Sequence, residues 1–368
     1  MQISFQKNFF ALAFAFLIGL FLWLTKSILI PIVFALLFAF VLYPIVKKLV
    51  SKGIGLTWSI LLTMLSITSV VLGTLVLFSA KLLSMLDQFK DFQGKLSSVM
   101  EKGIIFINEE VPFISDISME TIVQSIGELF STSGFSIVSG TITQTGTILS
   151  YVLLTFLYTF LILLYHKRLR KACLSFVKES EQEELSIMLR EVQQVGQKYV
   201  TGMGFLIIVL GVLNSIGLLI IGLDYAIFFG FFAAVLAIIP YVGTAIGGLI
   251  PTLYALLEYD SPWYPISIIL VFWFIQTLEG NVLSPKIVGG KLNLNALFAI
   301  IALIASAALW GLPGIILALP MAAILKVIFN SFDALKPLSA LMENDDSQED
   351  GNLIKKIKSS RLAKIFKK

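Results

Sequence analysis

The sequence is poor in the residues that most metal, redox and catalytic sites use. It has one cysteine, Cys173, and one histidine, His166, in 368 residues. A disulfide framework, a Cys-x-x-Cys redox pair and a Cys/His zinc site are therefore impossible within one chain. It also lacks a glycine-rich P-loop and a G-x-S-x-G nucleophile motif. We therefore expect no cofactor, no metal, no enzymatic activity and no ATP-driven transport by this chain alone.

Charge is scarce as well, and apolar residues are abundant. Charged residues make up 14% of the chain, against about 25% in an ordinary soluble domain. Hydrophobic residues make up 57%, and the mean hydropathy is +0.93. The composition excludes a soluble enzyme and predicts an all-α polytopic membrane protein with about eight hydrophobic membrane segments. Six of them fit simple spans: residues 9–25, 28–46, 56–79, 147–165, 205–223 and 263–278.

Two further apolar stretches, residues 226–257 and 296–329, are too long for a simple span. A straight helix of the first stretch would be about 48 Å long, and it would have to tilt by roughly 50° to fit the membrane. Each stretch is interrupted near its middle, at Pro240–Gly243 and at Gly311–Gly314. We expect two re-entrant hairpins of half-helices, each half about 21 Å long, although one kinked, protruding helix would also fit. If both stretches are hairpins, one span lies between them, so the first hairpin would enter the membrane from outside and the second from inside. The C-terminal half would then be an inverted repeat.

Lysine and arginine predict which side of the membrane each loop occupies. Lysine is frequent in residues 47–52, and lysine and arginine are frequent in residues 167–198, whereas residues 80–145 have four lysines against eight acidic residues. We therefore expect a multi-pass protein of the cell (cytoplasmic/inner) membrane. Both termini would be cytoplasmic, and residues 80–145 would lie outside.

The pattern divides the chain into five segments. These are three N-terminal spans (1–79), an extracytoplasmic amphipathic helical segment (80–146), a fourth span with a cytoplasmic amphipathic helix (147–202), a C-terminal transport core (203–336) and a cytoplasmic tail (337–368). The apolar faces of the amphipathic helices need a partner, which could be the protein's own spans, the membrane surface or a second copy. We expect a homo-oligomer. The tail changes from acidic to basic, so it could bind anionic membrane lipid or stay solvated, and no nucleic-acid binding is expected.

Polar residues are few in the C-terminal membrane half. Glu279 stands between Gln276 and Asn281 at the end of the sixth span. A charge at the bilayer centre costs at least about 2.5–3.5 kcal/mol, which makes Glu279 a functional candidate. An interfacial carboxylate that caps the local backbone is the alternative. Asn214 lies near the middle of the fifth span and is a second functional candidate. A structural hydrogen bond between helices is the alternative role for its side chain.

Prolines and glycines supply the remaining candidates. Paired interruptions of this kind are the best sequence pointer to the binding site of a secondary transporter. The residues concerned are Pro240, Gly243, Gly247, Pro251, Pro313 and Gly314. We expect a transport site between the two interrupted stretches, with Glu279 and Gln276 at its edge. Half-helix ends leave backbone groups free, which suits a small, neutral, hydroxylated substrate.

Four motifs resemble the autoinducer-2 exporter family: Ile239–Gly243, Ile246–Pro251, Glu279–Gly289 and Gly311–Pro320. The resemblance covers roughly residues 10–336. It implies export of small molecules, with autoinducer-2 as the name-giving substrate, and assembly as homo-oligomers. It also implies that some relatives are sodium or lithium/proton antiporters. It adds Pro285 and Lys286 to the candidate site.

Three functions therefore stay open. The first is export of a small polar molecule resembling autoinducer-2. The second is exchange of a monovalent cation for a proton, which would need a titrating group such as Glu279. The third is a non-transporting membrane scaffold that uses residues 80–145 for contacts.

The charge asymmetry generates a topology prediction. In a Cys173→Ser background, cysteines introduced within residues 85–130 should react with an impermeant maleimide added outside intact cells. Cysteines near residues 180 and 355 should react only after the cells are opened. Labelling of residues 166–200 from outside would reverse the orientation.

Overall fold

The computed structural model describes residues 5–86, 135–240, 242–259, 261–288 and 294–343, and these residues form helices without any strand. The greater part of the expected extracytoplasmic segment and the basic tail lie outside this described part. Within it, six helices are long and apolar enough to cross a membrane: residues 26–51, 56–78, 149–174, 179–221, 263–287 and 312–331. Two shorter apolar helices, 226–236 and 296–310, accompany them. The expected all-α polytopic membrane protein is confirmed.

The chain forms two compact units, each built from segments that are distant in the sequence. Unit 1 contains residues 1–63, 155–206 and 280–368, and unit 2 contains residues 64–154 and 207–279. Three long helices begin in one unit and end in the other: α3 (Leu56–Leu86), α6 (Phe135–Leu174) and α7 (Gln182–Ile221). The five linear segments expected from the sequence stay a prediction.

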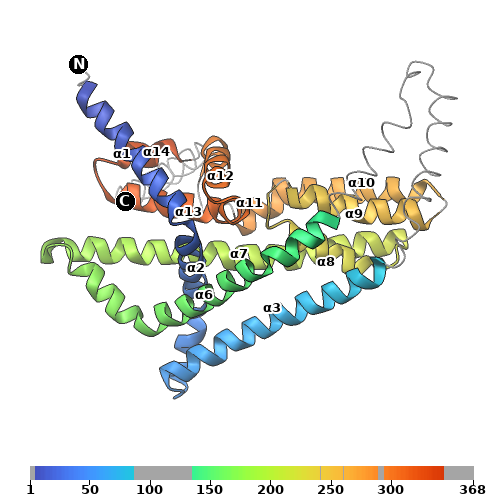
Figure 1. The fold of residues 1–368 in the computed structure, drawn as a ribbon, viewed down its shortest axis with the longest axis horizontal. Helices are drawn as coiled ribbons and strands as arrows, with labels where there is room; N and C mark the ends of the chain where they lie inside the picture. The colour runs from blue at the N-terminus through green and yellow to red at the C-terminus, as the bar shows by residue number, and fades with distance from the viewer. Residues whose placement is uncertain (1–4, 87–134, 241, 260, 289–293, 344–368) are drawn as a thin grey trace, which may run out of the picture. The chain divides into compact units, whose positions relative to one another are not determined.

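Unit 2 contains the first interrupted stretch, which is a helical hairpin. Helix α8 (Ala226–Leu236) and helix α9 (Val242–Glu258) lie side by side (Figure 1), joined by a turn that contains Pro240. The two helices approach closely because small residues face each other. A Cβ atom added to Gly247 would lie 2.8 Å from the Cβ of Ala233. A helical hairpin is therefore present in place of a single kinked helix, and its re-entrance into the membrane stays a prediction.

The two ends of this hairpin are held together at its base. The backbone N–H of Asp224 donates to the Tyr259 hydroxyl oxygen at 2.9 Å, and this hydroxyl lies 3.0 Å from Oδ2 of Asp224. Burial raises the pKa of Tyr259, so the phenol keeps its proton near neutral pH. The residues just before α8 and just after α9 are thereby fixed to each other. A third helix of unit 2, α10 (Trp263–Leu278), packs on α9.

Unit 1 contains the second interrupted stretch, which is also a hairpin. Helix α12 (Ala296–Trp310) begins at Asn295, whose side-chain oxygen accepts the Phe298 N–H at 2.9 Å. The break falls at Gly311, which has φ +63°, a conformation that favours glycine. Helix α13 (Leu312–Ser331) then packs back on α12, with Pro313 in its first turn. A proline there costs no hydrogen bond, because the first N–H groups of a helix have no partner within it.

The two hairpins differ from the equal halves expected from the sequence. Helices α8 and α9 have 11 and 17 residues, and α12 and α13 have 15 and 20. At 1.5 Å per residue, α13 is about 30 Å long and could cross the hydrocarbon core, whereas α8 is about 16 Å long and could not. The glycine break of the second stretch lies closer to its start than to its end, which leaves the longer half to α13.

Unit 1 also contains the packing partner of the amphipathic face predicted for residues 167–200. The core of unit 1 contains Leu37 of α2 (Lys26–Ser51) with Leu317 and Ile324 of α13, and Val192 of α7 packs against it. The apolar face predicted for residues 167–200 therefore has its partner within the chain. Helix α1 (Phe5–Leu24) is tied to α12, because Nε1–H of Trp310 donates to the Leu22 carbonyl at 3.0 Å. The remaining short helices are η3 (Glu179–Glu181), η4 (Glu279–Leu283, a π-helix), α11 (Ser284–Ile287) and α14 (Lys336–Leu341).

The hairpin turns generate a stability prediction. A Cβ atom at Gly314 would collide with the backbone carbonyl of Ser306, which cannot move aside as a flexible side chain can. We expect Gly314→Ala to destabilise the protein by about 1–3 kcal/mol through overpacking. Thermal unfolding in detergent, followed by the loss of the size-exclusion peak, measures the change.

The matched control is Gly204→Ala on α7. Nothing lies within 4 Å of a Cβ atom at this position. The substitution should be neutral or stabilising by up to about 1 kcal/mol, because alanine favours the helix over glycine. Equal melting temperatures for the two variants would contradict the close packing of α12 and α13.

Candidate functional site

Unit 2 contains a small cavity where four of its helical elements meet. Residues of α7, α8 and its turn, α9, and α10 line it: Leu210, Asn214, Ala233, Ala237, Thr244, Phe272, Ile275, Gln276 and Glu279. Its volume is about 10 Å³, enough for about one water molecule. We call it the Asn214 cavity. Three of the polar candidates from the sequence, Asn214, Gln276 and Glu279, therefore line the same cavity.

Asn214 is the most buried polar group of the cavity. Its side chain is 5% exposed, and its Oδ1 atom has no hydrogen-bond partner among the described residues. The neighbouring Ser215 is different, because its hydroxyl donates to the Gly211 carbonyl one turn earlier at 2.6 Å. A buried acceptor without a donor costs about 1–3 kcal/mol. Asn214 Oδ1 is therefore available to a donor that enters the cavity.

Glycines one turn on either side of Asn214 bring α7 close to its neighbours. A Cβ atom at Gly211 would lie 2.5 Å from Cδ1 of Phe231 on α8. A Cβ atom at Gly217 would collide with Val271 on α10, and one at Gly230 on α8 would collide with Ser215. These contacts hold Asn214 between α8 and α10, so its position depends on glycines that let Phe231, Val271 and the α8 backbone approach α7.

The α8–α9 turn contributes small side chains to the cavity. Ala233 and Ala237 line it from the α8 side and Thr244 from α9. Gly243 is buried beside the turn, and a Cβ atom there would collide with the carbonyl of Leu236. Gly243 and Gly247 therefore shape the turn without lining the cavity. Pro240 lies in the turn, and Pro251 is buried further along α9.

Helix α10 contributes the second amide, Gln276, and the carboxylate of Glu279 follows directly after its last residue. Phe272, Gln276 and Glu279 are spaced by four and three residues, which places them on one helix face. Glu279 is half-buried and is the first residue of the five-residue π-helix η4. Single π turns within α-helices are frequent at functional sites. The change of helical geometry therefore coincides with the one carboxylate that lines the cavity.

The other candidates from the sequence do not line the Asn214 cavity. Asn281, Pro285 and Lys286 are exposed on η4 and α11 in unit 1. The Gly202 backbone of α7 lies against this segment, since a Cβ atom there would be 2.9 Å from the Ile287 carbonyl oxygen. Pro313 and Gly314 form the first turn of α13, also in unit 1. The expected site between the two hairpins stays a prediction.

Sequence reasoning missed six of the nine lining residues, among them Thr244 and Phe272. Thr244 directly follows Gly243 in the interrupted stretch, so a hydroxyl beside a break in the helix was the available signal. Phe272 precedes Gln276 by one turn, but an aromatic residue in an apolar span carries no such signal. Among the described residues, no group of three or more His, Cys, Asp or Glu side chains could hold a metal ion.

Comparison with known families assigns the chain to a family. The model of the AI-2E family of transporters matches residues 10–334, a range that includes both hairpins and every residue of the Asn214 cavity. The chain belongs to the AI-2E transporter family. The resemblance seen in the interrupted motifs is thereby confirmed, and the protein is a member of a family of membrane permeases.

Curated relatives in the AI-2E family match over most of their length. "Putative transport protein YrrI" of Bacillus subtilis (strain 168) is 27% identical over 316 residues, which is 84% of this chain and 88% of the relative. "Putative transport protein YueF" of the same organism is 26% identical over 336 residues, 87% of this chain and 88% of the relative. "Putative transport protein YhhT" of Escherichia coli (strain K12) is 23% identical over 307 residues, 82% of this chain and 84% of the relative. These names describe transport without a substrate.

A mutation of Asn214 can distinguish a functional role in the cavity from a structural hydrogen bond between helices. Asn214→Leu removes a buried acceptor that has no described donor, so we expect the protein to keep its stability or gain about 1–3 kcal/mol. A structural hydrogen bond between helices would instead make the variant less stable. Thermal unfolding of the purified protein in detergent measures the difference.

Thr252→Val is the matched control. Thr252 is buried on α9, outside the cavity lining, and its hydroxyl donates to the Gly248 carbonyl at 2.7 Å. Loss of this bond should cost about 0.5–1.5 kcal/mol. An Asn214→Leu variant that is destabilised as much as Thr252→Val would show that Asn214 has a structural role.

Proposed function

We propose that this AI-2E family member is a secondary transporter that exports a small polar solute, and that the Asn214 cavity is part of its solute pathway. The observation that carries the proposal is the Oδ1 atom of Asn214, which has no hydrogen-bond partner in the described part of the chain and is buried in a cavity that Gln276 and Glu279 also line. Buried polar groups without partners are costly and are frequently functional in membranes. A hydroxyl group of a passing solute would supply the missing donor.

The lining fits a neutral, hydroxylated solute better than a fixed anion or cation. Amide and hydroxyl groups from Asn214, Gln276 and Thr244 offer both donors and acceptors, and Glu279 is the one charged residue of the lining. A solute such as autoinducer-2, the substrate that gives the family its name, has this chemistry. At about 10 Å³ the cavity is closed to such a solute, so transport requires the helices around it to separate.

Exchange of a monovalent cation for a proton is the second candidate. Two features favour it: the cavity is small, and a carboxylate shares it with an unpartnered amide oxygen. Hard cations prefer oxygen ligands, and a carboxylate can carry a proton in the opposite direction. In this mechanism Glu279 is the titrating group, and no large opening of the cavity is needed.

The setting of the proposed transport follows from the charge pattern. We place the chain in the cell (inner) membrane with both termini in the cytoplasm, in accordance with the positive-inside rule. We also propose that it works as a homo-oligomer and contacts membrane lipid and its solute as its partners. A scaffold without transport activity is the third function, and it predicts no flux of either kind.

Glu279→Gln separates the first two mechanisms. Purified protein in liposomes should release internal autoinducer-2, and Glu279→Gln should retain at least about half of this flux if recognition rests on hydrogen bonds. Asn214→Leu should reduce it by about tenfold or more, because about 1.4 kcal/mol of lost interaction is tenfold. Proton movement driven by Na⁺ or Li⁺ is measured in the same vesicles with a pH-sensitive dye.

The matched control is Glu258→Gln, which neutralises an exposed carboxylate at the end of α9 in the same unit. It should behave as the parent protein in both assays. Cation-driven proton movement that Glu279→Gln abolishes and Glu258→Gln keeps would establish the antiporter and reject the exporter. If the parent protein shows neither flux, both transport functions are rejected and the scaffold function remains.

A further inference from the structure

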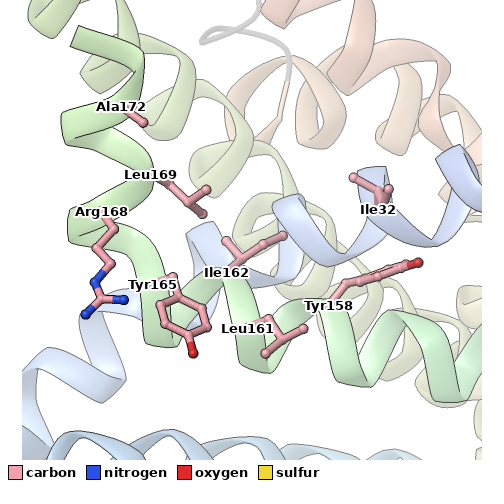
Figure 2. A pocket seen from close by; sticks show the side chains of 8 residues that line it. All are labelled: Ile32, Tyr158, Leu161, Ile162, Tyr165, Arg168, Leu169 and Ala172. Atoms are coloured by element: carbon pink, nitrogen blue, oxygen red, sulfur yellow. The ribbon is translucent and has the colours of Figure 1, made fainter. Parts of the chain in front are cut away.

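Unit 1 has a second and much larger cavity on the surface of α6. Its volume is about 490 Å³, and Figure 2 shows its lining: Ile32 of α2 with Tyr158, Leu161, Ile162, Tyr165, Arg168, Leu169 and Ala172 of α6. Each of these residues is half-buried or exposed, so the cavity is a surface groove. We call it the α6 groove. Its lining is apolar apart from two tyrosine hydroxyls and one arginine.

The arginine lies toward one end of the α6 groove, beyond Tyr165 (Figure 2). The guanidinium carbon of Arg168 is 5.6 Å from the centre of the Tyr165 ring, a cation–π distance. This contact holds the charge at the rim of the groove and leaves the N–H donors in the guanidinium plane available. A planar guanidinium with several donors is well suited to bind phosphate in a bidentate manner.

Further cations surround Arg168. Lys167, Arg170 and Lys171 are all exposed on the same helix. Arg170 donates to the Ser186 hydroxyl at 2.6 Å. The ion pairs within the described part of the chain, Lys326–Glu343 and Lys336–Asp333, involve none of these four cations. The end of the α6 groove therefore has a concentrated positive charge that no described carboxylate neutralises.

The dimensions of the α6 groove match one leaflet of a bilayer. Tyr158 and Arg168 are ten residues apart, which is about 15 Å along an α-helix. Half of a hydrocarbon core of about 30 Å is the same length. Tyrosine and basic residues are typical of the level at which the hydrocarbon meets the headgroups. An acyl chain along the groove would thus bring its headgroup to Arg168.

We propose that the α6 groove is a binding site for an anionic phospholipid, with one acyl chain along Tyr158–Tyr165 and the phosphate at Arg168. Charge complementarity selects this occupant. The apolar part of the groove can bind the acyl chain of any phospholipid. Only a headgroup with a net negative charge is attracted by the cations at residues 167–171. A second copy of this protein would have to supply carboxylates to these cations, because the groove lining contains none.

Native mass spectrometry of the detergent-purified full chain tests the proposal. The probes are palmitoyl-oleoyl-phosphatidylglycerol and phosphatidylcholine with the same chains. We expect at least fivefold more bound phosphatidylglycerol, and Arg168→Gln should remove this preference. Leu161→Trp should fill the groove and lower retention of both lipids. Glycerol phosphate, which has the headgroup charge without the chains, should not displace the bound lipid.

Arg190→Gln is the matched control, since Arg190 is an exposed arginine on α7 outside the groove lining. It should keep the lipid preference. Equal losses in Arg168→Gln and Arg190→Gln would show diffuse attraction and overturn the site. Unchanged retention in Leu161→Trp, or displacement by glycerol phosphate, would also overturn it. A change in oligomer mass without a change in bound lipid would assign the groove to a contact between copies.

Discussion

The constraint on which the structure depends is that lipid offers no hydrogen bonds to a polypeptide backbone. A helix interrupted inside the membrane must therefore be surrounded by protein at the break. Both hairpins meet this requirement with backbones that pack closely at small residues, at Gly247 against Ala233 and at Gly314 against the Ser306 carbonyl. Residues without bulk let the two halves shield the turn. The turns can then remain irregular, and the Asn214 cavity lies beside the first of them.

The same constraint explains why Asn214 differs from other buried residues with hydroxyl groups. Ser215, Thr252 and Thr159 each donate to a carbonyl one turn earlier in their own helix, so they are satisfied locally. An amide oxygen cannot do this, because it needs a donor and the N–H groups inside a helix are already used. The state of Asn214 Oδ1 is therefore decided by what lies outside its helix. The hydrogen bond of a buried hydroxyl group thus depends on its own helix, whereas the hydrogen bond of Asn214 Oδ1 depends on what occupies the cavity.

Sequence reasoning reached the hairpins because length and composition fix them. A stretch of 32 apolar residues with a proline and a glycine near its middle has few other solutions. It also placed Asn214, Gln276 and Glu279 among the candidates, since polar side chains are rare in the membrane part. It could not find that these three share a cavity with Thr244, because that depends on how closely α7, α8 and α10 approach. The continuous helix α7 was also missed, since its polar first half and apolar second half look like separate elements.

Tight backbone packing also limits how the Asn214 cavity can open. Gly211 and Gly217 are contacted by the side chains of Phe231 and Val271, and Gly230 lies against the backbone of Ser215, so the helices around the cavity interlock at these three positions. Opening must therefore move helices as rigid bodies, by the small sliding motions typical of packed helices. Such a motion separates Gly211 from Phe231, Gly217 from Val271 and Gly230 from Ser215. A solute that enters must therefore replace these contacts, and its hydrogen bond to Asn214 Oδ1, which has no partner among the described residues, offsets part of their loss.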